Sequence, residues 1–319
     1  MPTLSQWHID EALSQISVDY SNQELITESI APIVPSQKKS DLFFHFSKQK
    51  FRADKEDLLI GTGTDYRRMA LDVEPPERYV LDGYGLEFAI PDDLRENADP
   101  GADLDIQVTK TLTMRLGEFE EDNFANTVLA SSNLSTLGVP STTLSGGDQW
   151  SDYTNSDPIP VIHNSLITVK NQIGTFPNSI AMSDSVFFTL INHPRVIDRV
   201  KYTPGNGNHE PISRDELATL LKVKNIFVGA AIKQTAAEGA TDALGTIWPN
   251  NVFVFYRPDA PGKYEPAFAY TFLWTGGPFA SIIRRYREEW RNQDVLQLQK
   301  WFVQKIVEPK AAYAFLSAI

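Results

Sequence analysis

The run ADLDIQVTKTLTMRLGEFEEDNFANTVLAS, from Ala102 to Ser131, has no proline and a clear helical pattern. Its large apolar residues recur at steps of four and three, which places them on one face of an α-helix. They are Leu104, Val108, Leu112, Leu116 and Phe119. The stripe drifts near Asn123, and Asn97 or Asp99 is expected to cap the start of the helix. About thirty helical residues at 1.5 Å each would form a rod of roughly 45 Å, which is long for a compact soluble domain.

The composition is that of a folded, globular protein. The chain has 319 residues, of which 42% are hydrophobic and 22% charged, enough for one large domain or two ordinary ones. Its formal net charge of −12 argues against a main surface that grips nucleic acid. There is no cysteine, which excludes disulfides, thiolate catalysis and cysteine-ligated metals. The sequence shows no signal peptide and no apolar run long enough for a transmembrane helix.

Two segments before the long helix carry apolar residues but no core of their own. Residues 1 to 40 scatter apolar side chains without a period, and the prolines of Ala31–Pro35 keep that part extended. From Ser40 to Ile90 the chain reads as a long ribbon, with strands predicted at Leu42–Phe46 and Tyr84–Ile90. Because an isolated hairpin is only marginally stable in water, the arm and the ribbon are expected to pack against a partner, such as another subunit.

The rest of the chain alternates short helices and strands with turn-rich connections. Asp157-Pro158 opens a helix that Gly174 ends, and Ser213 forms a capping box with Glu216 before another helix. Residues 284 to 291 alternate between charged and aromatic side chains, with the period of a strand. Further strands are predicted at Ser179–Met182, Ile226–Val228, Val252–Phe255, Ala267–Trp274 and Val295–Val307.

The sequence shows no recognisable catalytic, metal or cofactor site. The five histidines lie far apart and lack the spacing of metal ligands. There is no phosphate-binding glycine loop and no G-x-S-x-G elbow. Four carboxylates cluster late in the long helix: Glu118, Glu120, Glu121 and Asp122. With no paired histidine or glycine loop beside them, they are interpreted as a solvated helix face in preference to an acid/base pair or a metal site.

The order of these parts resembles the major capsid proteins of tailed bacteriophages, which have the Hong-Kong-ninety-seven type of fold. Ile16–Val18 with Ile30–Pro35 looks like the N-terminal arm of that family, and Ser40–Phe46 looks like the entry to its extended loop. Asn192–Tyr202 looks like a helix pair of the axial domain, and Val295–Phe315 like the closing strands of the peripheral domain. The resemblance covers nearly the whole chain and rests on the order of these segments, since no single one is diagnostic.

The resemblance implies an α+β fold with a defined division of the chain. The helix at Ala102–Ser131 would be the long spine helix of the peripheral domain. The expected parts are an N-terminal arm at 1–44, an extended loop at 45–85, a peripheral domain with the spine helix at 86–150, an axial domain at 151–275 and a return to the peripheral domain at 276–319.

The resemblance also implies a structural protein that is not an enzyme. Such a protein self-assembles as hexamers and pentamers into the icosahedral head shell of a tailed double-stranded DNA bacteriophage. It would lie in the virion after assembly in the bacterial host cytoplasm, enclose DNA without sequence-specific binding, and need no cofactor and no membrane. The expected partners are a separate scaffolding protein, a portal and decoration proteins. The alternatives are the shell of an encapsulin-like protein compartment and a soluble enzyme of unrecognised type.

Two groups of opposite charge are expected to meet between subunits. In this family the extended loop lies over a neighbouring subunit, near its spine helix. Arg67 and Arg68 follow the glycine tip of the loop, and the four carboxylates lie on the helix, so the hypothesis places them in contact. The alternative is that both clusters only keep their surfaces solvated. Lys48, Lys50 and Lys55 lie where some relatives form lysine–asparagine links, but lysines are common in solvated loops and no cross-link is assigned.

Overall fold

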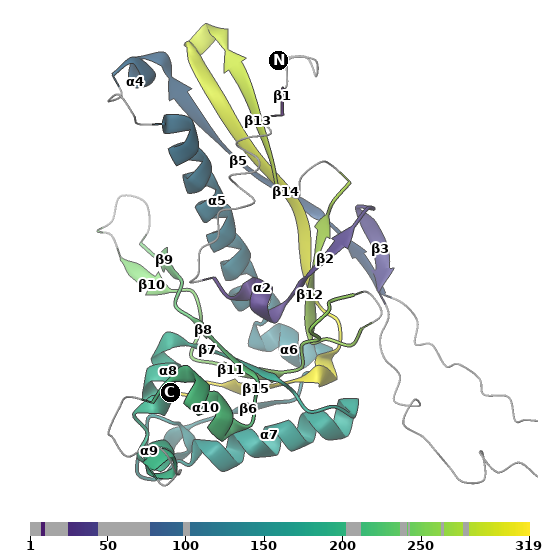
Figure 1. The fold of residues 1–319 in the computed structure, drawn as a ribbon, viewed down its shortest axis with the longest axis vertical. Helices are drawn as coiled ribbons and strands as arrows, with labels where there is room; N and C mark the ends of the chain where they lie inside the picture. Colours follow the sequence, from purple (N-terminus) through teal and green to yellow (C-terminus); the bar gives the residue numbers. More distant parts are fainter. Residues whose placement is uncertain are drawn as a thin grey trace, which may run out of the picture.

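The computed structural model describes residues 8–9, 25–43, 77–97, 103–201, 212–236, 241, 243–262, 265–276 and 281–319. These residues form a larger β-sheet in the upper part of Figure 1 and a smaller one in the lower part. A long helix lies beside the upper sheet, and a group of helices surrounds the lower sheet, where the C-terminus also lies. The mixture of helices with largely antiparallel sheets confirms the α+β class.

The thirty-residue helix predicted from the sequence is divided into segments of different geometry. α5 (Leu104–Asn123) continues directly into a π-helix, η3 (Phe124–Val128), and α6 (Ser131–Leu137) follows as a separate helix. Because a π-turn is wound more widely than an α-turn, it rotates the buried face of the helix, which explains the drift of the apolar stripe near Asn123. α5 alone is about 30 Å long, shorter than the predicted rod.

The residue that caps α5 is Asp103, so the prediction of Asn97 or Asp99 is wrong. The Asp103 carboxylate accepts a hydrogen bond from the backbone N–H of Ile106 at 3.3 Å, and its negative charge suits a helix N-terminus. Asn97 instead ends the short helix α4 (Asp92–Glu96), and Asp99 lies outside the described residues. The sequence pattern did not predict α4, so the predicted N-cap of α5 lay too early in the chain.

The upper sheet is organised around its longest strand, β14 (Gln293–Ile306). β5 (Asp82–Pro91) pairs antiparallel with one side of β14, while β13 (Ser281–Glu288) and β12 (Ala269–Trp274) pair antiparallel with the other side. The two outer strands are β1 (His8–Ile9) beside β13 and β2 (Ile33–Ser36) beside β12. The strand predicted at Val295–Val307 is confirmed as the centre of this sheet.

The apolar stripe of α5 packs on the upper sheet, although its last member stays partly exposed. Leu112 and Leu116 are buried against Leu296 and Leu298 of β14, which share one face of that strand. Phe119 is 41% exposed and contacts the ring of Tyr84 at a centroid distance of 4.8 Å. The stripe therefore predicted the packing of the helix centre and overestimated burial near its end.

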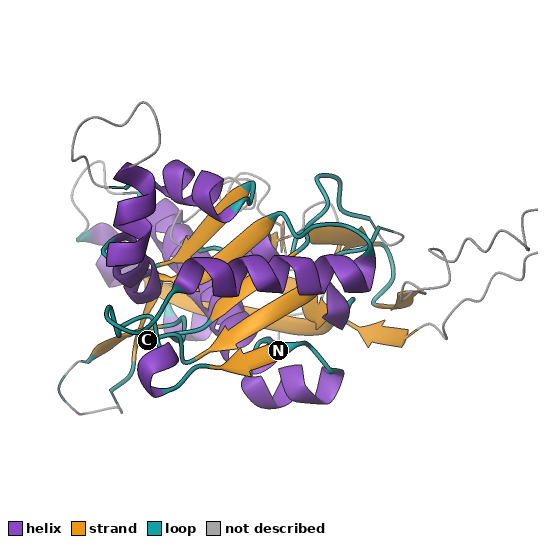
Figure 2. Cartoon of the chain, turned by 90° about the horizontal axis from the view of Figure 1, so that it is seen from below, coloured by secondary structure: helices purple, strands orange, loops and turns teal. Residues whose placement is uncertain are grey.

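The lower sheet has the strand order β6-β15-β11-β7-β8. Helices lie over it in the view from below in Figure 2. Its strands are β6 (Ser141–Thr143), β15 (Ala312–Leu316), β11 (Val252–Phe255), β7 (Ser179–Ser183) and β8 (Asn225–Gly229). Its helices are α7 (Pro158–Ile173), α8 (Asp184–Ile191), α9 (Pro194–Lys201) and α10 (Arg214–Leu221).

The local predictions in this lower part are confirmed. Pro158 lies in the first turn of α7, and Gly174 ends that helix with a left-handed φ of 79°. Ser213 and Glu216 form the predicted capping box of α10. All four residues of β11 are buried, as expected for an apolar strand between two neighbours.

Sheet membership divides the chain differently from the expected boundaries. β12, expected in the axial segment 151–275, pairs with β14 in the upper sheet. β15, expected in the peripheral return 276–319, pairs with β11 in the lower sheet. The chain therefore crosses between the two sheets once more than the linear division implies, because strands distant in sequence complete each sheet.

The base of the predicted ribbon has a core within the same subunit. β3 (Ser40–Phe43) pairs with β4 (Glu77–Val80), and the intervening residues, with Arg67 and Arg68, lie outside the described ones. The Tyr79 ring stacks on Phe272 of β12 at a centroid distance of 4.0 Å, and both side chains are fully buried. The base of the ribbon is thus anchored on the upper sheet.

Candidate assembly interface

The four carboxylates of the predicted interface lie on the last turns of α5 and point in different directions. Glu118 has a partly exposed side chain and pairs with Arg115 of the same helix at 3.3 Å. Glu120 and Glu121 are buried, being 8% and 1% exposed. The interpretation as a solvated helix face is therefore wrong for these two residues, because this end of α5 is covered on more than one side.

Glu121 fastens the N-terminal segment to the helix. Its two carboxylate oxygens accept hydrogen bonds from the backbone N–H groups of Ile26 and Thr27 at 3.0 and 2.9 Å. These donors begin the short helix α2 (Thr27–Ile30), whose first N–H groups have no partner within the helix. The indole N–H of Trp248 donates to the same carboxylate. A single side chain thereby joins three segments of the chain.

Glu120 holds another face of the helix against the sheet. Lys300 of β14 reaches both of its carboxylate oxygens, at 2.7 and 2.9 Å, and both side chains are largely buried. The side chain of Gln304 donates to the Glu120 carbonyl at 3.0 Å. Burial raises the pKa of Glu120, while the Lys300 charge and hydrogen bond act in the opposite direction.

Asp122 connects the helix to a small hairpin formed by β9 (Ile232–Gln234) and β10 (Leu244–Thr246). Its carboxylate pairs with Lys233 of that hairpin and accepts a hydrogen bond from Asn126 at 2.7 Å. Asn126 also donates to the Ile247 carbonyl at 3.1 Å. Three of the four carboxylates thus bind other segments of their own chain. The sequence did not predict this structural role.

The predicted contact with a neighbouring subunit stays a prediction. Arg67 and Arg68 lie outside the described residues, and a single chain holds no neighbour. Glu120 and Glu121 already have buried partners, so a contact through them would have to replace existing bonds. Glu118 and Asp122, with side chains 25% and 36% exposed, are the members of the cluster that remain accessible.

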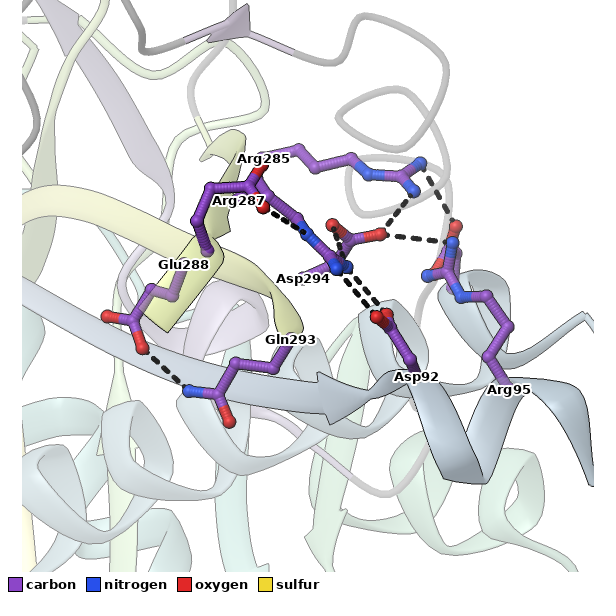
Figure 3. Close-up of polar contacts among 9 residues, drawn as sticks. Asp92, Arg95, Arg285, Arg287, Glu288, Gln293 and Asp294 are labelled. Atoms are coloured by element: carbon purple, nitrogen blue, oxygen red, sulfur yellow. Dashed lines mark hydrogen bonds and ion pairs between the residues drawn. The ribbon is translucent and has the colours of Figure 1, made fainter. Parts of the chain in front are cut away.

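A second charged network lies at the other end of α5 and was not singled out from the sequence. It joins α4, the first turn of α5, and the β13–β14 hairpin (Figure 3). Asp294 on β14 lies within 3.1 Å of Arg95 and within 2.9 Å of Arg285. Arg287 makes two hydrogen bonds of 2.6 Å to Asp92. Asp105 of α5 completes the network through Arg95 and Arg285.

The arginines of this network lower the pKa values of Asp92 and Asp294. Hydrogen bonding to Arg287 is the main cause for Asp92. Burial alone would raise the pKa of Asp294, but hydrogen bonds and charges of Arg285 and the neighbouring arginines lower it overall. The signal in the sequence was the spacing of Arg285 and Arg287 by two residues, which puts both on one face of a strand.

Among the histidines that the structure describes, His193 makes defined contacts near the start of α9. His193 is buried before α9, where its Nδ1 accepts a hydrogen bond from the Arg195 N–H at 3.2 Å and its Nε2 lies 3.0 Å from the Ser156 hydroxyl oxygen. Burial lowers its pKa. His193 thus lies at a helix end, where its side chain is held by contacts within the chain. Within the described ranges, no three His, Asp or Glu side chains gather as a metal site, and no helix is long and apolar enough to cross a bilayer.

Two sequence relatives of the chain are both named major capsid protein. That of Burkholderia phage BcepMu is 28% identical over 275 residues, which cover 85% of each chain. That of Pseudomonas phage JBD67 is 27% identical over 282 residues, which cover 83% of each chain. No protein-family model matches the sequence.

Solved structures share the fold over almost the entire chain. A phage-related protein from Bordetella bronchiseptica, 24% identical, has a TM-score of 0.76 and 97% of each chain is covered. The capsid of Cyanophage P-SCSP1u, 12% identical, has a TM-score of 0.58, with 93% of this chain and 89% of the other covered. The SrpI encapsulin of Synechococcus elongatus, 10% identical, has a TM-score of 0.55, with 97% and 95% covered. The fold is therefore that of phage capsids and encapsulins.

Proposed function

We infer that this chain is a structural major capsid protein of the tailed-phage family, with the Hong-Kong-ninety-seven type of fold, and that it self-assembles into the shell of a virion. The observation that carries this conclusion is the similarity to the BcepMu major capsid protein, which extends over 85% of both chains. The fold supports it independently, because the two sheets and the long helix match assembled capsids over most of their length.

We propose that the subunits form hexamers and pentamers of an icosahedral head that encloses double-stranded DNA. The net charge of −12 suits a shell that surrounds DNA without gripping its phosphates. A separate scaffolding protein, a portal and decoration proteins are the proposed partners, and the bacterial host cytoplasm is the proposed place of assembly. The role is structural, and no catalytic step is proposed for it.

Sheet membership supports a revised division into domains. We propose that the peripheral domain consists of the upper sheet with α4 and α5, and the axial domain of the lower sheet with α7 to α10. β12 then belongs to the peripheral domain, and β6 and β15 to the axial domain. The ribbon that leaves at β3 and returns at β4 is the proposed extended loop.

Sedimentation and electron microscopy test the proposed function. The purified chain, expressed alone and with the scaffold gene of its phage, is expected to yield rings, sheets or closed shells far larger than the 35.8 kDa subunit. Analytical ultracentrifugation at micromolar concentration measures their size, and negative-stain images show their form. A monomer under all of these conditions would contradict the proposal.

An encapsulin-like shell is the second candidate, because the fold matches the SrpI encapsulin with a TM-score of 0.55. The sequence relatives favour the phage capsid, since both are phage proteins. The contents of native particles separate the two functions. Double-stranded DNA resistant to added nuclease indicates a head, and a packaged enzyme without DNA indicates a compartment.

A further inference from the structure

The turn that leads into the ribbon carries a lysine held between two tryptophan rings. Lys39 lies between β2 and β3, and its ammonium nitrogen is 3.3 Å from the ring centroid of Trp301 and 4.8 Å from that of Trp274. The two indoles lie nearly perpendicular, with centroids 6.5 Å apart. An ammonium group over the face of an indole is attracted by the negative potential of the ring.

The rings belong to the body of the subunit, whereas Lys39 belongs to the start of the ribbon. Trp274 ends β12 and Trp301 lies within β14, so both are fixed by the upper sheet. The Trp274 indole N–H also donates to the Gln37 carbonyl at 3.3 Å, which holds the same turn. The contact therefore spans the junction between a rigid sheet and the segment that leaves it.

Two glycines lie against the indole rings, and their lack of a side chain leaves room for these rings. A Cβ at Gly83 of β5 would lie 2.8 Å from the Trp301 ring, and a Cβ at Gly276 would lie 2.4 Å from the Trp274 ring. Both distances are shorter than a normal van der Waals contact. The backbone thus approaches the two rings closely, and larger residues at these positions would displace them.

The other side of the same junction is fixed by backbone and core contacts. The Lys39 carbonyl accepts a hydrogen bond from the Leu81 N–H at 2.8 Å, which ties the outgoing strand to the returning one. Phe43 and Tyr79 are buried against Phe272 on the sheet. The aromatic core anchors one side of the ribbon base, and the Lys39 contact restrains the turn on the other.

From this arrangement we propose that Lys39, clamped by Trp274 and Trp301, is a positioning residue that sets the direction in which the ribbon leaves the subunit and so controls assembly. The inference rests on the proposed function, in which the ribbon reaches a neighbouring subunit. One exposed cation–π contact shifts an equilibrium by roughly twofold to fivefold. The same contact recurs in every subunit of a shell. A small change in the orientation of the ribbon in each subunit therefore has a large combined effect on assembly.

Three substitutions distinguish the clamp from a general effect of charge. Lys39→Met keeps an unbranched apolar stem and removes the ammonium group, while Lys39→Arg keeps a cation that stacks on indoles. Lys38→Met is the matched control, because Lys38 is exposed one residue earlier and its replacement changes the net charge equally. Since Lys39 is itself exposed, none of the three is expected to change the melting temperature of the unassembled subunit appreciably.

Spin labels measure the direction of the ribbon directly. The chain has no cysteine, so cysteines introduced at exposed Leu42 on the ribbon and exposed Lys110 on α5 are the only labelling sites. Pulsed dipolar spectroscopy on the unassembled subunit should give one narrow distance distribution for the parent chain, Lys39→Arg and Lys38→Met. It should give a broader or shifted distribution for Lys39→Met. Particle yield by sedimentation should fall severalfold for Lys39→Met alone.

Several results would overturn the inference. An unchanged distance distribution for Lys39→Met means that the clamp does not direct the ribbon. A changed distribution with full particle yield means that this direction does not govern assembly. Equal damage from Lys38→Met and Lys39→Met assigns the effect to net charge. If the parent chain forms no particles, the proposed function fails and the assembly role fails with it, while the spin labels still show whether Lys39 orients the ribbon.

Discussion

The two ends of α5 hold their charged side chains in different surroundings. At the end near α4, the arginines of Figure 3 and Asp92 remain partly open to solvent, with Arg95 and Asp92 each 37% exposed at the side chain, while Asp294 between them is 16% exposed. At the opposite end, Glu120 and Lys300 are only 10% and 15% exposed, and Glu121 is fully enclosed. Similar residue types thus form a solvated network at one end and buried fastenings at the other.

Burial, more than the number of ion pairs, decides how much a charged side chain contributes to stability. Removing one partner from a buried pair leaves an uncompensated charge, whereas water replaces much of an exposed contact. The network in Figure 3 contains more ion pairs, yet each is expected to contribute less than the bonds of Glu121.

The largest effect is expected for Glu121→Ala. It leaves the N–H groups of Ile26, Thr27 and Trp248 without their acceptor, and each unpaired buried group costs about 1–3 kcal/mol, so a total loss of at least about 3 kcal/mol is expected. Urea unfolding of the unassembled subunit measures it. Glu121→Gln should recover part of the loss, because its carbonyl oxygen still accepts. Glu118→Ala, at a partly exposed site on the same helix, is the control, with an expected loss below about 0.5 kcal/mol.

A smaller but still large effect is expected for Lys300→Met. It leaves Glu120 buried without its cation, at a cost of about 3 kcal/mol in the free energy of unfolding. Adding Glu120→Gln removes the isolated charge, so the double variant should be more stable than Lys300→Met alone. The urea midpoints of the two single variants and the double variant decide the matter. Simply additive losses would show that the two side chains act independently.

The exposed network should give a modest effect that depends on pH. Asp294→Asn is expected to cost about 1 kcal/mol at pH 7, because the three arginines around it stay hydrated. The lowered pKa of Asp294 means that the unfolded chain takes up the proton first, so this contribution is present above about pH 4 and disappears as the pH falls through the folded-state pKa. Unfolding at pH 7 and pH 3 should show a smaller difference between variant and parent at the lower pH. A difference that persists at pH 3 would assign the effect to packing.

The smallest effect per subunit is expected between subunits, where Arg67 and Arg68 are predicted to approach the helix. Reversing both arginines to glutamate should lower particle yield, most clearly at low salt, since an exposed pair contributes only about 0–1 kcal/mol and salt screens it. Because Glu120 and Glu121 hold their own chain, the compensating change is Glu118→Lys, which leaves the buried bonds intact. Sedimentation of each variant and the combination measures rescue. Damage that adds without rescue means that these residues do not meet.

Local sequence pattern determined much of the secondary structure. The spacing of Leu112 and Leu116 gave the buried face of α5, and Gly174 gave the end of α7. Each depends on residues within a few positions, where backbone geometry and capping rules act directly. The same local patterns, taken in order along the chain, carried the resemblance to the capsid family.

Tertiary structure alone decided which charges are buried and which strands share a sheet. Glu121 bonds to Ile26, 95 residues earlier, and Glu120 to Lys300, 180 residues later, so no local pattern distinguishes them from the partly exposed Glu118. β15 joins the lower sheet although the strand before it, β14, lies in the upper one. A carboxylate in a helix has the same local sequence whether water or another segment covers it. The environment that sets its energy is supplied by chain segments that only the fold brings together.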